Sequence, residues 1–216
     1  VGGGTHSGRG MRLVSIVVFN ASRRIIDKGK RIAARLLESD PSRVAFEEGR
    51  FRIEETGRAL SLFEVAAAAE RLDDLPPDLR GPLTAFADET VKEASFPYGA
   101  HVCEVEIDPE LGAVEIVRYA AVDDAGRAVN PMILHGQAHG GIAQGIGQAL
   151  MERMAYAPES GQVLSGSFMD YGIPRAHLLP FFDVELTEDP TSGNALRVKG
   201  GGESGITPAL AVVMNA

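Results

Sequence analysis

Apolar residues recur every three or four positions from about Met11 to Glu38, which predicts one long helix with a single apolar stripe. Asp40-Pro41 then ends the pattern, because proline does not continue a helix. Beyond it, apolar and polar residues alternate at Val44–Phe46 and Phe51–Ile53, on either side of Glu48-Gly49. Two such runs around a glycine turn predict a short β-hairpin.

A second helix is predicted at Leu62–Leu72, with Ser61 as its N-cap and Glu64 three residues later completing a capping box. Farther along, Cys103–Ile107 alternates apolar with acidic residues and predicts a strand with one apolar face. Val114–Val122 is mostly apolar, so we expect it to be the return strand and to lie centrally in its sheet.

The last third of the chain alternates between helical and extended patterns. A long glycine-rich helix is predicted from about Pro131 to Met154, short strands at Phe182–Leu186 and Leu196–Val198, and an apolar helical pattern at Ile206–Ala216. Strands and helices are mixed without a strict β-α-β rhythm, so the sequence predicts an α+β fold with mixed sheets and long packed helices.

The two ends of the chain predict a fragment of a longer polypeptide. The sequence opens without Met inside a glycine loop, and its last helical pattern lacks a C-terminal glycine or a basic last turn. We therefore expect residues 1–216 to be a C-terminal domain fragment, with a division into two subdomains left open.

Composition excludes several classes of protein. The formal net charge is −9 and no dense Lys/Arg stripe is present, which argues against a nucleic-acid partner. No apolar run approaches the roughly 20 residues of a membrane helix, so no membrane insertion is expected. Cys103 is the single cysteine, which excludes an internal disulfide and an all-cysteine iron–sulfur cluster held by this chain alone. A cytoplasmic location is the expected default, and Cys103 is expected to be a small hydrophobe on its strand.

The 25 glycines gather in three clusters, near residues 2–10, 136–147 and 200–205. Such clusters mark places where backbone passes close to another group, so three of them suggest one large ligand wrapped by three loops. The first cluster carries hydroxyls and Arg9 in front of a helix, a pattern that suits phosphate but lacks the Gly-Lys-Ser/Thr of a P-loop. The third, Lys199–Gly205, contains Glu203, which is either a general base or part of an ordinary turn.

The other polar candidates are weaker. Gly140–Gln148 allows either close helix packing or close approach to a cofactor, and both alternatives stay open. His135 and His139 have the spacing of a zinc-protease helix, but Gly136 stands where that motif needs Glu, so we expect polar contacts beside a ligand or an interface and no metal ligands. His101 is expected to be structural, and Asp123 and Asp124 are expected to be turn or strand-edge acids.

Five motifs, in order along the chain, resemble the cofactor-binding part of the large subunit of molybdenum hydroxylases. That family includes xanthine dehydrogenase, aldehyde oxidoreductases and the carbon monoxide dehydrogenase large chain. The motifs are Gly3-Gly4-Thr5-His6-Ser7-Gly8-Arg9, Asp124-Ala125-Gly126-Arg127-Ala128-Val129-Asn130-Pro131, the segment from Gly136 to Leu150, Gly166-Ser167-Phe168-Met169-Asp170-Tyr171, and Lys199 to Gly205.

The resemblance implies a molybdopterin cofactor, as its cytosine dinucleotide, whose metal takes no protein side chain as ligand. It implies that Glu203 is the base that takes a proton during hydroxylation of an aldehyde or N-heterocycle, or in oxidation of carbon monoxide. It also implies a pterin contact from Gln137. The remaining cofactor-binding residues that it implies are Gly4, Thr5, His6, Ser7, Gly8, Arg9, Gly201 and Gly202.

Partners follow from the same resemblance. FAD and 2Fe-2S clusters are expected on other subunits or domains, and the missing N-terminal half of the subunit is expected to complete the pocket for a small-molecule substrate. The fragment alone is then expected to be inactive. The alternative is a non-catalytic scaffold or subunit-assembly domain whose glycines serve packing.

Overall fold

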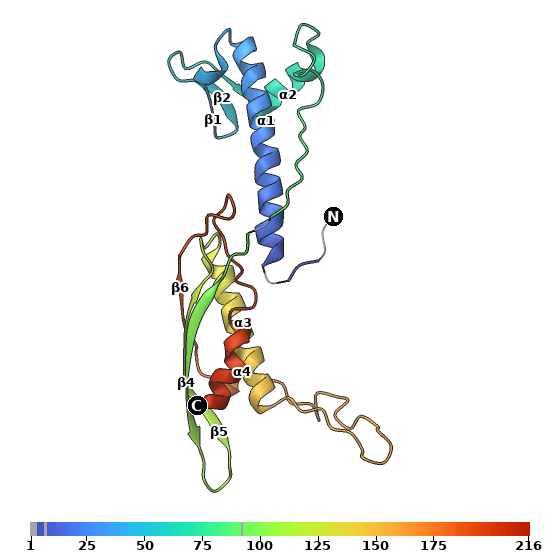
Figure 1. Ribbon diagram of the computed structural model, residues 1–216, viewed down its shortest axis with the longest axis vertical. Coiled ribbons are helices and arrows are strands. Elements are labelled where there is room, and N and C mark those ends of the chain that lie inside the picture. The colour runs from blue at the N-terminus through green and yellow to red at the C-terminus, as the bar shows by residue number, and fades with distance from the viewer. Residues whose placement is uncertain (1–3, 7, 92) are drawn as a thin grey trace. The chain divides into compact units, whose positions relative to one another are not determined.

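The computed structural model describes residues 4–6, 8–91 and 93–216, and the chain divides into two compact units. One unit is Ile16–Thr90, and the other combines Val1–Ser15 with Val91–Ala216. Helices accompany two separate three-stranded sheets, which confirms the predicted α+β class (Figure 1). In the described ranges, no helix has the length and apolarity needed to cross a bilayer.

The unit Ile16–Thr90 contains most of the long helix and the hairpin that the sequence predicts. Helix α1 spans Ser15–Leu36 and is preceded by a π-helical turn at Gly10–Val14, so the predicted helix forms with a wider first turn. Further bounds are a 3₁₀ turn at Pro41–Arg43, β1 at Val44–Glu47, β2 at Arg50–Ile53, β3 at Ala59–Ser61 and α2 at Leu62–Arg71.

The packing of this unit confirms the predicted hairpin and capping box. Strands β1, β2 and β3 pair antiparallel in chain order, with Val44 opposite Ile53. The Ser61 hydroxyl accepts the Glu64 N–H while the Glu64 carboxylate accepts the Ser61 N–H, so both ends of the box are closed. Fully buried Ile32 of α1, Phe51 of β2 and Val65 of α2 belong to one apolar core.

The other unit is built on a sheet of β4 (Tyr98–Ile107), β5 (Val114–Asp124) and β6 (Asp183–Thr187). Strand β5 is central, antiparallel to β4 and parallel to β6, as its apolar sequence predicts. Helix α3 (Pro131–Leu150), a 3₁₀ turn (Ala176–Leu178) and α4 (Ile206–Asn215) complete the unit, and Figure 1 shows α3 and α4 together beside the sheet. Tyr119, Ile142 and Phe182 lie in its core, with Cys103 half-buried against it.

Besides the first turn of α1, three predicted elements differ from the structure by more than two residues. Strand β4 begins at Tyr98, five residues before the predicted start at Cys103. Helix α3 ends at Leu150, four residues before Met154, because Met151 takes a non-helical backbone conformation. Leu196–Val198 does not form a strand, and Val198 makes an isolated bridge to Gly126. The physical reason is local: Arg197 takes a left-handed backbone conformation (φ +61°), which interrupts an extended run.

The glycines of α3 serve packing on one face of the helix. A Cβ added at Gly141 would lie 2.7 Å from Ile206 N, and one added at Gly145 would lie 2.5 Å from Ala209 Cβ. Both contacts join α3 to α4, so the packing interpretation holds at these positions. Gly136 and Gly140 have no atom within 4 Å of an added Cβ. At these two positions, close approach to a cofactor stays possible as an interpretation.

We expect Gly141→Ala and Gly140→Ala to change stability in opposite directions. Alanine at 140 meets open space and favours the helix by about 1 kcal/mol, whereas alanine at 141 presses on the backbone of α4 and costs about 1–3 kcal/mol through overpacking. Urea unfolding of both variants measures the difference. Equal stability of the two variants would contradict the packing role of Gly141.

Candidate functional site

Two cavities meet at the loop that contains Glu203. The larger cavity, of about 640 Å³, lies between the N-terminal loop, the start of α3 and the loop before α4; the smaller, of about 450 Å³, lies between that last loop and the start of β4. Gly202 and Glu203 line both cavities. The larger one is lined by Thr5, His6, Gly8, Gly10, Met11, Ala125, Arg127, Val129, Asn130, Ile133, Leu134, Gln137, Val198, Lys199, Gly201, Gly202 and Glu203.

Most of the residues singled out in the sequence come together in the larger cavity. Thr5, His6 and Gly8 come from the first glycine cluster, Gln137 from α3, and Gly201, Gly202 and Glu203 from the last loop. Gly4 and Arg9 do not line it. Ser7 lies outside the described residues, as do Gly2 and Gly3.

Glycine is required where the loops touch. Gly8 has φ +69°, and a Cβ on it would lie 2.5 Å from Gly200 Cα, so the first and last loops meet backbone to backbone. A Cβ on Gly201 would lie 2.6 Å from Leu134 Cδ2 of α3. Gln137 Nε2 donates to Gly202 O at 3.4 Å, which ties α3 to the same loop. The last loop therefore contacts both the first loop and α3, and these contacts keep the three walls of the larger cavity together.

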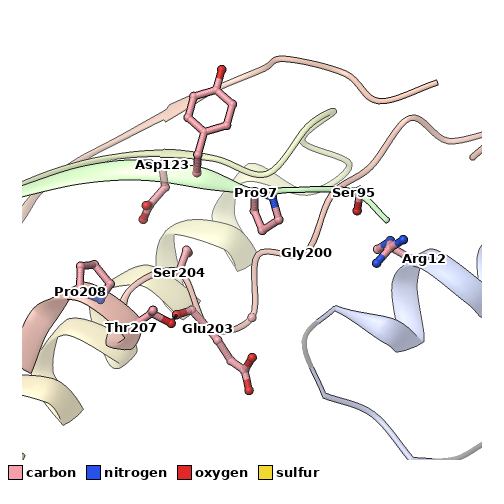
Figure 2. Close-up of a pocket in the computed structure, with 12 residues that line it drawn as sticks. Arg12, Ser95, Pro97, Asp123, Gly200, Glu203, Ser204, Thr207 and Pro208 are labelled. Atoms are coloured by element: carbon pink, nitrogen blue, oxygen red, sulfur yellow. Dashed lines mark hydrogen bonds between the residues drawn. The ribbon is translucent and has the colours of Figure 1, made fainter. Parts of the chain in front are cut away.

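Glu203 stands at the entry to α4. Its carbonyl oxygen accepts from the Thr207 hydroxyl (2.7 Å) and from Thr207 N (3.1 Å), which fixes the loop backbone to the first turn of the helix. Figure 2 shows the Glu203 and Asp123 carboxylates pointing in different directions. Because these hydrogen bonds fix the backbone of Glu203, its side chain projects from a defined position, as a catalytic base requires.

The larger cavity is lined by charged side chains and by a helix N-terminus. Its charged lining residues are Arg127, Lys199 and Glu203, and Lys199 is paired with Asp124 and Asp189. It also receives the N-terminus of α3, where the Asn130 side chain caps Ile133 N at 3.2 Å. Helix N-termini carry a partial positive charge, so the lining suits an anionic group.

A buried ion pair anchors the loop. Lys199 Nζ lies 2.6 Å from Asp124 Oδ2 and 3.0 Å from Asp189 Oδ2, and the Asp124 side chain has no exposed surface. Asp124 Oδ1 also accepts Gly126 N and Asp189 N. Burial raises the pKa of Asp124, but these hydrogen bonds outweigh it and hold that pKa below its usual value. The hydrogen bond to Asp124 raises the pKa of Lys199.

The neighbouring carboxylate, Asp123, belongs to a second buried group. Its Oδ1 lies 3.2 Å from His101 Nε2, and His101 Nδ1 lies 2.9 Å from the Tyr119 hydroxyl. Burial raises the pKa of Tyr119, and the Asp123 charge adds to this. The structural role expected of His101 fits these contacts. The prediction that Asp123 and Asp124 are turn or strand-edge acids is wrong, because both are buried at the end of the central strand β5. Two acids at the end of an apolar strand are the sequence signal for such a buried pair.

Within the chain, His139 makes ring contacts. Its ring packs against Phe181 and Phe182, with centroid distances of 5.4 and 5.8 Å. Over the described ranges, no group of three His, Cys, Asp or Glu side chains is placed to hold a metal ion.

Comparison with known proteins gives consistent matches. Residues 1–180 match the molybdopterin cofactor-binding domain family. The chain is 35% identical over all 216 residues to the 6-hydroxypseudooxynicotine dehydrogenase complex subunit gamma of Paenarthrobacter nicotinovorans, covering 27% of that protein. It is 32% identical over 201 residues, 93% of the chain, to the carbon monoxide dehydrogenase large chain of Afipia carboxidovorans, covering 25% of it.

A solved structure agrees with these sequence matches. The crystal structure of quinoline 2-oxidoreductase from Pseudomonas putida 86 superposes with a TM-score of 0.87 at 32% identity, covering 99% of this chain and 27% of that one. The chain thus spans about a quarter of the length of the relatives it matches. The family match ends at residue 180, whereas the match to the gamma subunit covers the whole chain and so includes the Glu203 loop.

Proposed function

Because the chain belongs to the molybdopterin cofactor-binding domain family, we propose that it is part of the large catalytic subunit of a molybdenum-dependent hydroxylase or dehydrogenase. The observation that carries this proposal is the larger cavity. Three segments far apart in the sequence line one space of about 640 Å³, and they contribute Thr5, His6 and Gly8, then Gln137, then Gly201, Gly202 and Glu203. That volume lies within the range of cofactor sites, roughly 300–1,000 Å³.

The lining of the larger cavity fits a pterin that carries phosphate. Gly8 and Gly201 let the first loop, the last loop and α3 meet closely around the cavity, because a Cβ at either position would overlap Gly200 or Leu134. Arg127 and the N-terminus of α3 offer donors to phosphate oxygens. We assign the cofactor as molybdopterin cytosine dinucleotide, contacted by Thr5, His6 and Gly8, with Gly4, Ser7 and Arg9 in the same loop.

The residues of the chain then have separate tasks. When bound, the molybdenum cofactor supplies the oxidation and oxygen-transfer chemistry. Glu203 accepts a proton on its carboxylate during the attack on the substrate, and Gln137 holds Gly202 O while presenting its amide to the pterin. Lys199, paired with Asp124, fixes the start of the loop that carries the base.

The complete enzyme in this proposal is cytoplasmic and made of several parts. An N-terminal half of the same subunit completes the substrate pocket, and FAD and 2Fe-2S clusters lie on other subunits or domains. The subunit and large-chain names of the relatives support such an assembly. The substrate is an aldehyde, an N-heterocycle or carbon monoxide.

Metal and nucleotide analysis of the complete protein, purified from its natural host, tests the proposal. We expect molybdenum and, after acid hydrolysis, a released cytosine nucleotide in equal amounts. The alternative is a non-catalytic assembly domain, which the packing of Gly141 and Gly145 against α4 favours. A protein that assembles without metal and pterin would support that alternative and overturn the enzyme proposal.

A further inference from the structure

The smaller cavity collects three buried polar atoms that lack hydrogen-bond partners. They are Arg12 Nε, Ser95 Oγ and Asp123 Oδ2, and all three residues line it. Within the described part of the chain, no other buried side-chain nitrogen or oxygen is left without a partner. A buried polar group without a partner costs free energy, so their gathering in one cavity indicates a missing ligand.

Asp123 is the acceptor end of the cavity. Its side chain is 5% exposed; Oδ1 is engaged by His101, and Oδ2 has no partner. Figure 2 shows the carboxyl group directed from β5 toward the side of the cavity formed by Ser204 and Pro208. Gly99 pairs with Asp123 across the strands, and a Cβ there would overlap Asp123 Oδ1. The site is therefore built around this carboxylate.

Arg12 and Ser95 form the donor end. Arg12 Nη2 donates to Glu93 O at 3.2 Å, which fixes the guanidinium beside Ser95 in the chain and leaves Nε–H to the cavity. Ser95 precedes Gly99, the partner of Asp123, by four residues, so the Cα atoms of Ser95 and Gly99 are at most about 14 Å apart. The strand pairing adds about 5 Å, so the Cα atoms of Ser95 and Asp123 are at most about 19 Å apart. The cavity therefore has a hydrogen-bond acceptor at one end and hydrogen-bond donors at the other.

We propose that the smaller cavity binds an elongated small molecule with a protonated amine at Asp123 and a carbonyl or carboxylate oxygen at Arg12 and Ser95. An ammonium supplies the charge-assisted donor that a buried carboxylate oxygen needs, and the guanidinium supplies the complementary donor at the far end. The volume of about 450 Å³ accommodates such a molecule. The site shares the wall of Gly202 and Glu203 with the larger cavity, but it requires neither the cofactor nor the proposed base.

Calorimetric titration of the complete protein with 6-aminohexanoate tests the proposal. We expect 6-aminohexanoate to bind at least tenfold more tightly than hexylamine or hexanoate, each of which satisfies one end only. Asp123→Asn and Arg12→Gln are each expected to weaken its binding at least tenfold. Asp183→Asn, at an exposed acid at the start of β6, is the matched control and is expected to leave binding unchanged.

The readouts separate this site from the enzyme proposal. Binding of 6-aminohexanoate is measured with and without bound molybdenum, whereas the role of Glu203 is measured by turnover, so either can fail alone. If Asp123→Asn does not fold, Arg12→Gln and the rise in Tm of the unaltered protein on adding 6-aminohexanoate decide the matter. Absence of binding, or binding that both variants leave unchanged, would overturn the proposal.

Discussion

Replacing Glu203 with glutamine is expected to lower kcat by about a hundredfold to ten-thousandfold while the molybdenum content stays unchanged. Glutamine preserves the size of the side chain and its place between the two cavities, but its amide cannot accept the proton. The loop itself is held through the Glu203 carbonyl, Thr207 and the contact of Gly201 with α3, none of which the substitution alters. Turnover of an aldehyde or N-heterocycle, with metal analysis of the same sample, measures the effect.

A matched control separates the base from a general effect of lost charge. Glu188→Gln removes a carboxylate from an exposed position just after β6, and it is expected to retain the kcat of the unaltered enzyme. If Glu203→Gln loses molybdenum, the role of Glu203 is to retain the cofactor and not to transfer a proton. A kcat within a few-fold of the unaltered enzyme would remove Glu203 from the reaction altogether.

Much of the fold was predictable because its elements are locally encoded. The apolar stripe of α1 and the alternation before Ile107 each place apolar side chains on one face, and the capping box at Ser61 marks a helix start. All three elements formed, although β4 begins five residues before the predicted Cys103. Leu196–Val198 failed because Arg197 takes a left-handed backbone conformation (φ +61°), which an extended strand does not contain. The apolar pattern of a few residues does not reveal such a turn.

The candidate site was predictable from the sequence only where clustered glycines indicated close contacts between segments. The first and third glycine clusters supply Gly8, Gly201 and Gly202 to one cavity, whereas the second cluster forms helix α3 and lines that cavity through Gln137 and none of its glycines. The partners of Asp123 and Asp124 were not predictable, because Asp124 meets Lys199 from 75 positions away and Asp123 meets His101 across the β4–β5 pair. Such contacts follow from strand register and loop closure, which exist only in the folded chain.

The Lys199–Asp124 pair is expected to be the largest electrostatic contribution to the stability of its unit. Asp124→Asn leaves the Lys199 ammonium with the exposed Asp189 as its remaining carboxylate, and it weakens the acceptor for Gly126 N and Asp189 N. Removing one member of a buried pair is strongly destabilising, and we expect Tm to fall by roughly 5–10 °C. Thermal unfolding at pH 7 measures this, with Asp183→Asn as the exposed-acid control and an expected change near zero.

The pH dependence of unfolding tests whether the Lys199–Asp124 charge pair causes the loss of stability in Asp124→Asn. The pKa of Asp124 is lowered from 3.8 in the folded chain, so its stabilising contribution is present above about pH 4 and is lost as pH falls through the lowered value. The pKa of Lys199 is raised from 10.5, so its contribution is present below that pH and is lost as pH rises through the higher value. Urea unfolding of the unaltered chain and of Asp124→Asn is therefore expected to differ most between pH 5 and 9 and to converge toward pH 2. A constant difference across that range would mean that the loop before Glu203 is held by packing and not by this charge pair.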